Sequence, residues 1–189
     1  MAVDAVFHMH LPLDENWPHI IESENRYDFS EGGDLATGEI DQDFFDSVRI
    51  HVEIPKGLSA DALKYGKYML LSERAKNLFA SKVADCCAPF VRVMVNDQPY
   101  FILVPTRVID CLDKDRSEIE HGRLNLFWVL KWRFNKTLIP DTSFFEIPKR
   151  AGTKFVTSEF KKAIEAAGLN GFRFLDFEKA DRDAPGMLE

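Results

Sequence analysis

Two histidines near the start of the chain have the spacing of metal ligands on a strand. In the run His8-Met9-His10, side chains two residues apart point to the same face of an extended backbone, so both imidazoles could bind one metal ion. A zinc site needs at least a third protein ligand, and the neighbouring sequence supplies none. We therefore expect exposed or hydrogen-bonded histidines without a metal.

A second group of oxygen-bearing side chains resembles the start of a calcium-binding loop. Asp113, Asp115 and Ser117 have the required alternate spacing. The sixth position is Glu118, where such a loop needs glycine, and the twelfth is Leu124, where it needs a bidentate glutamate. We therefore reject calcium binding at this loop.

Three ionisable residues close by, Glu118, Glu120 and His121, could form an acid–base cluster. Their place in the charged stretch Asp113–Arg123 favours an exposed loop instead. The chain also lacks the glycine-rich phosphate loops and the nucleophile elbow of common enzyme families. We expect no catalytic residues and no cofactor.

Basic and aromatic side chains alternate later in the chain, a pattern that could stack on single-stranded nucleic acid. The basic residues are Lys131, Arg133 and Lys136, and the aromatic residues are Trp128, Trp132 and Phe134. On a strand, this alternation places the aromatic rings in the core and the basic groups in solvent. We favour a half-buried strand over a nucleic-acid surface.

The pair Ser-Glu, with Lys three residues after the Glu, occurs twice, in Lys67–Val83 and in Lys154–Phe174. A nucleophilic serine would need a general base, and neither segment places a histidine nearby. Ser72 and Ser158 each follow a short strand, in the position of a helix N-cap, with the glutamate in the positive first turn. We interpret the repeat as a helix-initiation signal.

The hydrophobic pattern along the chain predicts more strands than helices. The predicted strands are Val48–Ile54, Lys67–Leu71, Phe90–Val95, Tyr100–Val104, Arg107–Leu112, Leu124–Phe134, Phe144–Ile147, Lys154–Thr157 and Gly171–Phe177. Asn96–Pro99 is predicted to be a four-residue turn, and helices follow Ser72 and Ser158, the second closed by Gly168. Strands and helices do not alternate regularly. The sequence therefore predicts a single α+β domain over residues 1–189 with a largely antiparallel sheet.

The three cysteines, Cys86, Cys87 and Cys111, lack the spacing of a metal or redox motif. Adjacent cysteines pair poorly with each other, so we expect all three to be small core residues in a reducing compartment. The N-terminus has no secretory signal pattern, and no apolar run is long enough to span a membrane. These features predict a cytoplasmic protein without a membrane partner.

Negative charge is concentrated in residues Asp14–Asp46, which we call the acidic segment. It contains eleven acids and one base, Arg26, for a net charge of −10; the whole chain carries −7, and the remainder therefore +3. Phosphates would be repelled here, which argues against a nucleic acid partner. The charge favours encounter with a basic protein partner, although an acidic loop that only aids solubility has the same composition.

Aromatic and aliphatic residues within the acidic segment indicate that part of it packs on the protein. The run Glu31–Asp34 and the pair Thr37-Gly38 form its best flexible break. The candidate partner contacts are Trp17, Glu22, Glu24, Tyr27, Asp28, Glu31 and Asp34. The two aromatic residues are the candidate anchors, because aromatic side chains at the centre of an interface tend to dominate affinity.

Several stretches together resemble a known bacterial family. They are Val108–Asp113 with the following Ser117, Leu70–Phe79, Phe144–Ile147, and the strand and helix of Lys154–Phe174. The pattern is similar to a myxobacterial-type immunity-protein domain of polymorphic toxin systems, formerly a domain of unknown function. The resemblance covers roughly residues 65–177, and its most specific part is the helix that begins at Ser158 and the glycine-containing turn after it.

The resemblance implies a small cytoplasmic protein, encoded beside a toxin gene, that binds the cognate toxin and neutralises it by occlusion without catalysis. The acidic segment lies mostly outside the resemblance, which suits a part that varies with the partner. Two other classes stay open. One is an enzyme that reverses the toxin's action, with His121, Glu118 or Asp115 as acid–base groups. The other is a structural or adaptor protein that assembles with itself as a homo-oligomer.

Overall fold

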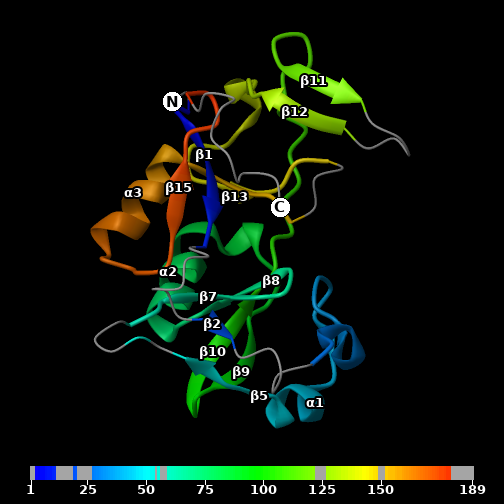
Figure 1. Ribbon diagram of the computed structural model, residues 1–189, viewed down its shortest axis with the longest axis vertical. Coiled ribbons are helices and arrows are strands. Elements are labelled where there is room, and N and C mark those ends of the chain that lie inside the picture. The colour runs from blue at the N-terminus through cyan, green and yellow to red at the C-terminus, as the bar shows by residue number, and fades with distance from the viewer. Residues whose placement is uncertain are drawn as a thin grey trace.

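Two sheets, one above the other in Figure 1, form the framework of the protein. The computed structural model describes residues 3–11, 19–20, 27–53, 55, 59–121, 127–148 and 152–179. The upper sheet has the order β13 (Phe144–Phe145), β14 (Lys154–Thr157), β1 (Val6–His10) and β15 (Arg173–Leu175), all antiparallel. The lower sheet has the order β5 (Arg49–Ile50), β9 (Val91–Val95), β10 (Gln98–Leu103), β8 (Tyr68–Leu71) and β7 (Ala62–Tyr65). Of its pairs only β5 with β9 is parallel, so the largely antiparallel α+β fold is confirmed.

Smaller elements surround the two sheets. Three strand pairs are β2 (His19–Ile20) with β6 (Val52–Glu53), β3 (Gly33–Asp34) with β4 (Glu39–Ile40), and β11 (Glu118–His121) with β12 (Phe127–Lys131). In the described residues, the α-helices are α1 (Gln42–Ser47), α2 (Glu73–Val83) and α3 (Ser158–Ala166), and the 3-10 turns are η2 (Phe29–Gly32), η3 (Ala84–Cys86) and η5 (Lys136–Leu138). None of the helices in the described part of the chain is long and apolar enough to cross a membrane.

Buried side chains form three clusters that follow the faces of the sheets. The lower cluster covers one face of the lower sheet and includes Phe29 and Phe45 from the acidic segment. The middle cluster covers the other face of that sheet and one face of the upper sheet, with buried residues from both α2 and α3. The upper cluster covers the second face of the upper sheet, together with Val129 and Trp132. The middle cluster therefore joins the two sheets.

The two Ser-Glu helices begin differently. The Ser72 hydroxyl caps α2 by accepting a hydrogen bond from the Ala75 amide at 3.3 Å, as the sequence predicts. Helix α3 instead starts at Ser158 itself, and its N-cap, Thr157, makes no side-chain capping bond. The Thr157 hydroxyl accepts from the amide of Ser143 at 3.1 Å, within the upper sheet. The prediction of an N-cap at Ser158 is therefore wrong, because Ser158 is already the first helical residue, and the hydroxyl at the N-cap position, that of Thr157, is bonded to Ser143 instead.

One predicted strand, Val48–Ile54, is divided because the chain changes neighbours. In Val48–Ile54, β5 pairs with β9 and β6 pairs with β2. At the first residue of β6, the Asn96 side chain accepts from the Val52 amide at 3.0 Å and donates to the Val52 carbonyl at 2.7 Å. Asn96 and Asp97 both have positive φ, as a two-residue hairpin turn requires, so the predicted four-residue turn is shorter than expected.

The predicted strand Arg107–Leu112 forms only isolated bridges. Val108 bridges Glu146 in parallel, and Leu112 bridges Phe134 in antiparallel orientation. The segment thus leaves Glu146 and reaches Phe134 within a few residues, which is too short a distance for a regular hydrogen-bonded strand pair to form with either neighbour. Part of the stretch predicted as a charged loop is instead strand β11, which pairs with β12.

Candidate functional site

Residues 27–46 of the acidic segment pack on the lower sheet. Its elements η2, β3, β4 and α1 lie at the lower right of Figure 1. Phe29, Leu35 and Phe45 are buried in the lower cluster, so the prediction that the segment is partly docked is confirmed for these residues. Trp17, Glu22 and Glu24 lie outside the described residues.

The expected flexible break is closely packed. A Cβ on Gly32 would lie 2.4 Å from the Phe44 ring and 2.5 Å from the Phe45 ring, and one on Gly33 would lie 2.2 Å from the Glu39 carbonyl oxygen. Gly33 also has a φ of +106°, a conformation that side chains with a Cβ rarely adopt. These glycines fix the turn into the β3–β4 hairpin, so the predicted break at Glu31–Asp34 is wrong, whereas Thr37-Gly38 lies in the turn between the two strands.

The carboxylates of residues 27–46 divide into two groups, and all of them are exposed. Four support the local fold: Asp28 and Asp41 cap η2 and α1, Asp34 accepts from the Ala36 amide, and Asp46 bonds to Gln42 and Arg92. The other three, Glu31, Glu39 and Asp43, make no side-chain hydrogen bond or ion pair with the described residues. We call Glu31, Glu39 and Asp43 the free carboxylates.

Tyr27 is held against the protein. Its backbone amide donates to the Tyr65 hydroxyl at 2.8 Å, and that hydroxyl donates back to the Tyr27 carbonyl at 3.2 Å. Its own hydroxyl accepts from the Arg49 amide at 3.4 Å, and its ring packs on the lower cluster. Tyr27 therefore has a structural role, and only part of its surface is open to a partner.

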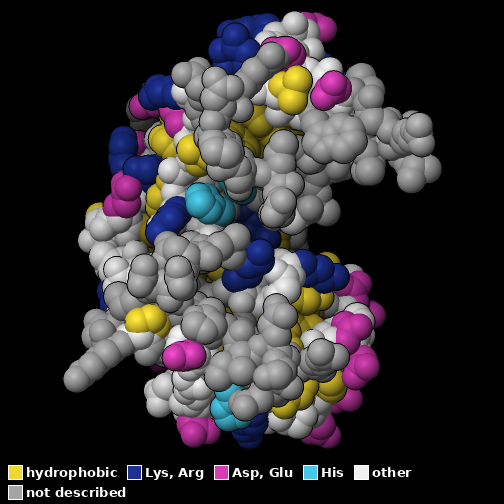
Figure 2. Space-filling model, in the orientation of Figure 1, with side chains coloured by type: hydrophobic (Ala, Val, Ile, Leu, Met, Phe, Trp, Pro, Cys, Tyr) yellow, Lys and Arg dark blue, Asp and Glu magenta, His cyan; other side chains and the backbone are white. Residues whose placement is uncertain are grey.

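A cleft of about 600 Å³ separates the docked acidic segment from the upper sheet. Figure 2 shows the molecule hollowed where its upper and lower parts meet, with Lys and Arg side chains at the hollow and Asp and Glu along the lower edge. One wall of the cleft comes from η2 and β3, the opposite wall from Glu146, Gly152 and Lys154, and apolar residues lie between the walls. Those apolar residues are Tyr68, Leu103, Val104 and Pro105.

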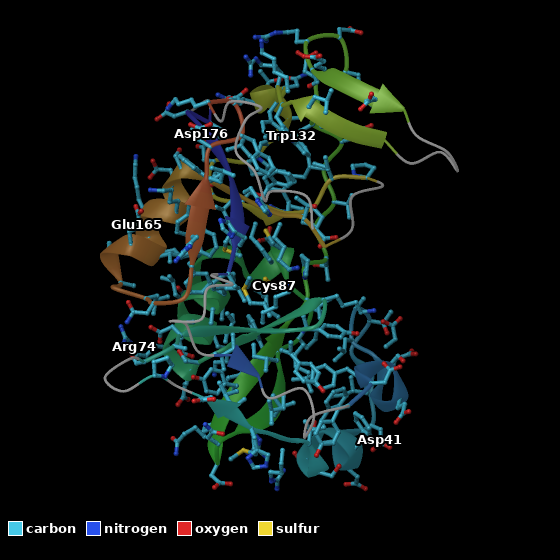
Figure 3. All side chains as sticks on the ribbon, viewed as in Figure 1. Asp41, Arg74, Cys87, Trp132, Glu165 and Asp176 are labelled. Atoms are coloured by element: carbon cyan, nitrogen blue, oxygen red, sulfur yellow. The ribbon has the colours of Figure 1, made fainter. Side chains whose placement is uncertain are left out.

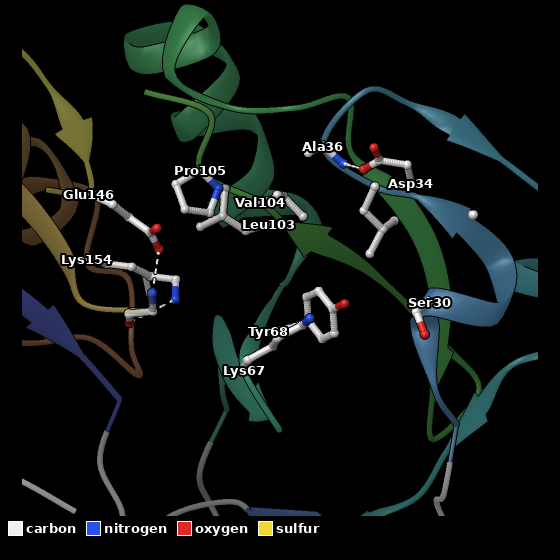
Figure 4. Close-up of a pocket in the computed structure, with 13 residues that line it drawn as sticks. Ser30, Asp34, Ala36, Lys67, Tyr68, Leu103, Val104, Pro105, Glu146 and Lys154 are labelled. Atoms are coloured by element: carbon white, nitrogen blue, oxygen red, sulfur yellow. Dashed lines mark hydrogen bonds between the residues drawn. The ribbon is translucent and has the colours of Figure 1, made fainter. Parts of the chain in front are cut away.

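Lys154 is the buried charged group of this cleft. It begins β14 and is 8% exposed, and its ammonium donates to the Gly152 carbonyl at 3.3 Å (Figure 4). Burial lowers the pKa of Lys154, and the nearby carboxylate of Glu146 opposes that shift. Sequence reasoning missed this residue. The available signal was a lysine that opens a strand otherwise composed of Phe155, Val156 and Thr157.

His8 and His10 share a face of β1, with ring centroids 5.3 Å apart. They are half-buried, and Phe177 stacks on His8 at 4.8 Å. Burial, reinforced by the charges of His10 and Lys154, lowers the pKa of His8 to about 4. Among the residues that the structure describes, no group of three or more His, Cys, Asp or Glu side chains could hold a metal ion.

The candidate acid–base residues Glu118 and Glu120 lie on β11 and are exposed, and the side chain of His121 lies outside the described residues. The Asp113 carboxylate accepts from the Arg116 amide at 3.1 Å. The Ser117 hydroxyl bonds to both backbone groups of Arg133. These two residues therefore fix the turn before β11.

The strand interpretation of the basic and aromatic run holds only in part, because β12 ends at Lys131, Phe134 adds one isolated bridge, and Lys136 lies in η5. Trp132 and Phe134 are buried, and Lys131 is exposed. Lys136 pairs with Glu178 at 2.7 Å. Figure 3 shows Trp132 within the upper part of the molecule, among the side chains of the upper cluster.

The cysteines are free thiols in or beside the core. Cys86 and Cys111 are buried, as predicted, whereas Cys87 is half-buried between the upper and lower parts (Figure 3). Burial raises the pKa of Cys87 and of Cys111 to about 12, so both stay protonated at neutral pH.

The fold and the cleft define a small α+β protein with an acidic docked segment along one wall of an open cleft. The chain belongs to the immunity protein family (Imm11), which its sequence matches over residues 13–179. The match is longer than the resemblance over residues 65–177, and it includes the acidic segment. No curated protein matches the chain.

Proposed function

We propose that this protein is a non-enzymatic immunity protein that binds a cognate bacterial toxin in the cytoplasm and neutralises it by occlusion. The observation that carries this proposal is the family match over residues 13–179. The proposed partner is the product of an adjacent gene, with a basic contact surface. Nucleic acid and membrane are not proposed as partners.

The free carboxylates support a protein-binding role for the acidic segment. Glu31, Glu39 and Asp43 stand on a part of the chain that is anchored by buried phenylalanines. A rigid surface of one charge speeds encounter with an oppositely charged partner without an ordering cost on binding. Asp28 and Asp34, also candidate contacts, support the local fold and are poor choices for a test.

The direct test is co-purification of the tagged protein with the product of the adjacent gene, followed by association kinetics at low and high salt. The test variant carries Glu31→Lys, Glu39→Lys and Asp43→Lys. We expect its association rate at low salt to fall at least ~10-fold, with a flatter salt dependence.

A matched control carries the same change in net charge elsewhere. Asp4→Lys, Asp115→Lys and Glu120→Lys alter exposed carboxylates that make no side-chain hydrogen bond or ion pair with the described residues. The control should associate nearly as fast as the unmodified protein. Equal slowing of both variants would mean that net charge alone matters, and would remove the acidic segment from the interface.

Stoichiometry separates binding from catalysis. A protein that occludes the toxin protects only near a one-to-one ratio, whereas an enzyme that reverses the toxin's action protects at substoichiometric amounts. Full protection at a tenth of the toxin concentration would refute occlusion. A solution mass of the isolated protein tests the self-assembling alternative.

A further inference from the structure

Lys154 is buried with most of its hydrogen-bonding capacity unused. An ammonium group has three donors, and the described residues provide one acceptor, the Gly152 carbonyl. The Glu146 carboxylate opposes the lowering of the Lys154 pKa, but the two side chains form no ion pair. A buried charge that forms no ion pair costs free energy, so an anionic group that enters the open cleft and pairs with Lys154 would be stabilised there.

The other charged groups of the cleft are already engaged. Glu146 accepts from the Gly152 amide at 3.0 Å, and Asp34 accepts from the Ala36 amide at 2.9 Å. The Lys67 ammonium lies over the ring of Tyr68, 5.1 Å from its centroid. In Figure 4, Lys154 and Glu146 face the Asp34 wall across the gap, and Lys67 and Tyr68 lie between them.

We propose that the cleft binds a single carboxylate, presented by an acidic side chain that the partner protein inserts between the two sheets, with Lys154 as its counter-charge. The proposal rests on the proposed function for the existence of that partner. The volume of about 600 Å³ accommodates such a side chain together with apolar neighbours.

The lining favours a protein side chain over a free phosphate. Leu103, Val104 and Pro105 provide an apolar floor that a phosphate would leave uncovered. The described lining has no arginine for bidentate phosphate binding, and the carboxylates of Asp34 and Glu146 would repel a doubly charged anion more than a carboxylate.

The cleft and the free carboxylates would then have different tasks. The acidic surface outside the cleft attracts a basic partner, and this attraction sets the association rate. The buried lysine inside the cleft selects one acid of that partner, and a desolvated charge pair of this kind sets the dissociation rate.

The test uses the whole protein, with its lysines labelled with ¹³C at Cε and observed by NMR. The probe is the capped tripeptide Leu-Glu-Leu, compared with Leu-Gln-Leu. We expect the glutamate peptide to shift the Lys154 resonance with saturation in the millimolar range, and the glutamine peptide to bind at least ~10-fold more weakly. Equal shifts with both peptides, or none, would overturn the proposal.

Two variants extend the test to the product of the adjacent gene. Lys154→Gln removes the counter-charge, and Ala36→Trp obstructs the cleft from its exposed rim without altering the core. Lys82→Gln, an exposed lysine on α2 outside the cleft, is the matched control. We expect the first two variants to dissociate from the partner at least ~10-fold faster than the control.

The outcomes separate the two proposals. If the unmodified protein binds the toxin and all three variants bind it equally well, the cleft proposal fails and the immunity function stands. If the glutamate peptide binds at Lys154 but no neighbouring gene product forms a complex, the carboxylate site stands and the proposed function fails.

Discussion

At the scale of single residues, His8 makes the free energy of unfolding depend on pH. Its imidazole lies against Phe177 and Phe155, with His10 stacked beside it and Lys154 contributing positive charge. A buried neutral imidazole resists protonation in the folded state, whereas the unfolded chain protonates near pH 6.5. Between about pH 4 and 6.5 the unfolded state therefore binds more protons, and the free energy of unfolding falls as the pH falls.

We expect His8→Phe to remove this dependence while keeping the ring contacts. From pH 7 to pH 4, the unmodified protein should lose about 3 kcal/mol more unfolding free energy than the variant, which follows from the pKa of about 4. Urea denaturation at both pH values measures the difference. His51→Gln, at an exposed position, is the control and should keep the pH dependence; identical curves for His8→Phe and the unmodified protein would contradict the prediction.

Residue chemistry was only partly predictable from the sequence. The shared face of His8 and His10 follows from the period of a strand, and the buried Trp132 and Phe134 follow from the same alternation. The depression of the His8 pKa depends on Phe155 and Phe177, which lie far away in the chain and meet it only in the folded sheet.

At the scale of elements, Asp61 connects the two Ser-Glu helices. Its buried carboxylate accepts from the Ser72 hydroxyl at 2.7 Å, at the start of α2, and from the Asn170 amide at 2.9 Å, just after α3. Arg74 on α2 also donates to the Ala167 carbonyl at the end of α3. The repeated sequence therefore forms two helices, and the N-terminus of α2 lies against the C-terminus of α3.

We expect Ser72→Ala to destabilise the protein by about 1–2 kcal/mol, because it removes the cap of α2 and one donor to the buried Asp61. Ser158→Ala is the matched control, since its hydroxyl caps no helix, and its effect should be within about 0.5 kcal/mol of zero. Chemical denaturation of both variants tests the contrast. Equal losses would mean that Ser158 has a role that the cap geometry does not reveal.

Element types were predictable where the local pattern was strong, and boundaries were not. Helix α2 and strand β14 follow from local signals, and so does the end of α3, where Gly168 follows the C-cap with a φ of +60°. The single bridges within Arg107–Leu112 and the division of Val48–Ile54 do not, because they depend on which distant strand lies alongside.

At the scale of the whole molecule, Phe79 packs the lower half of the protein onto the upper half. This residue of α2 contacts Phe160 of α3 at a centroid distance of 4.8 Å, Phe144 of β13 at 5.5 Å, and Phe172 before β15 at 6.0 Å. It is fully buried in the middle cluster. The prediction of a single domain can be tested at this contact, since two independent units would not need it.

We expect Phe79→Ala to cost about 3–5 kcal/mol and to separate the unfolding of the two sheets. Tryptophan fluorescence is recorded in a Trp17→Phe, Trp128→Phe background, so that it reports on Trp132 in the upper cluster. Its transition and that of far-UV circular dichroism should coincide without the Phe79 substitution and diverge with it. Phe101→Ala, at a half-buried position on β10, is the control and should leave the two transitions coincident. Divergent transitions in the unmodified protein would contradict a single domain.

The cleft belongs to this scale as well, and sequence reasoning did not find it. Its walls combine residues near position 34 with residues near position 154, and no local pattern indicates that these segments face each other. The sequence shows that one segment is acidic, but it does not show that this segment forms a wall of a cleft.

The close packing around Gly32 has a consequence for how this protein can evolve. No larger residue fits there without displacing Phe44 and Phe45, so the hairpin that carries the acidic surface tolerates little change in its backbone. Glu31 and Glu39 beside it can be exchanged freely, because nothing in the described fold depends on their side chains. Gene copies could therefore acquire new binding preferences by a few point mutations, while natural selection preserves the same hairpin beneath them.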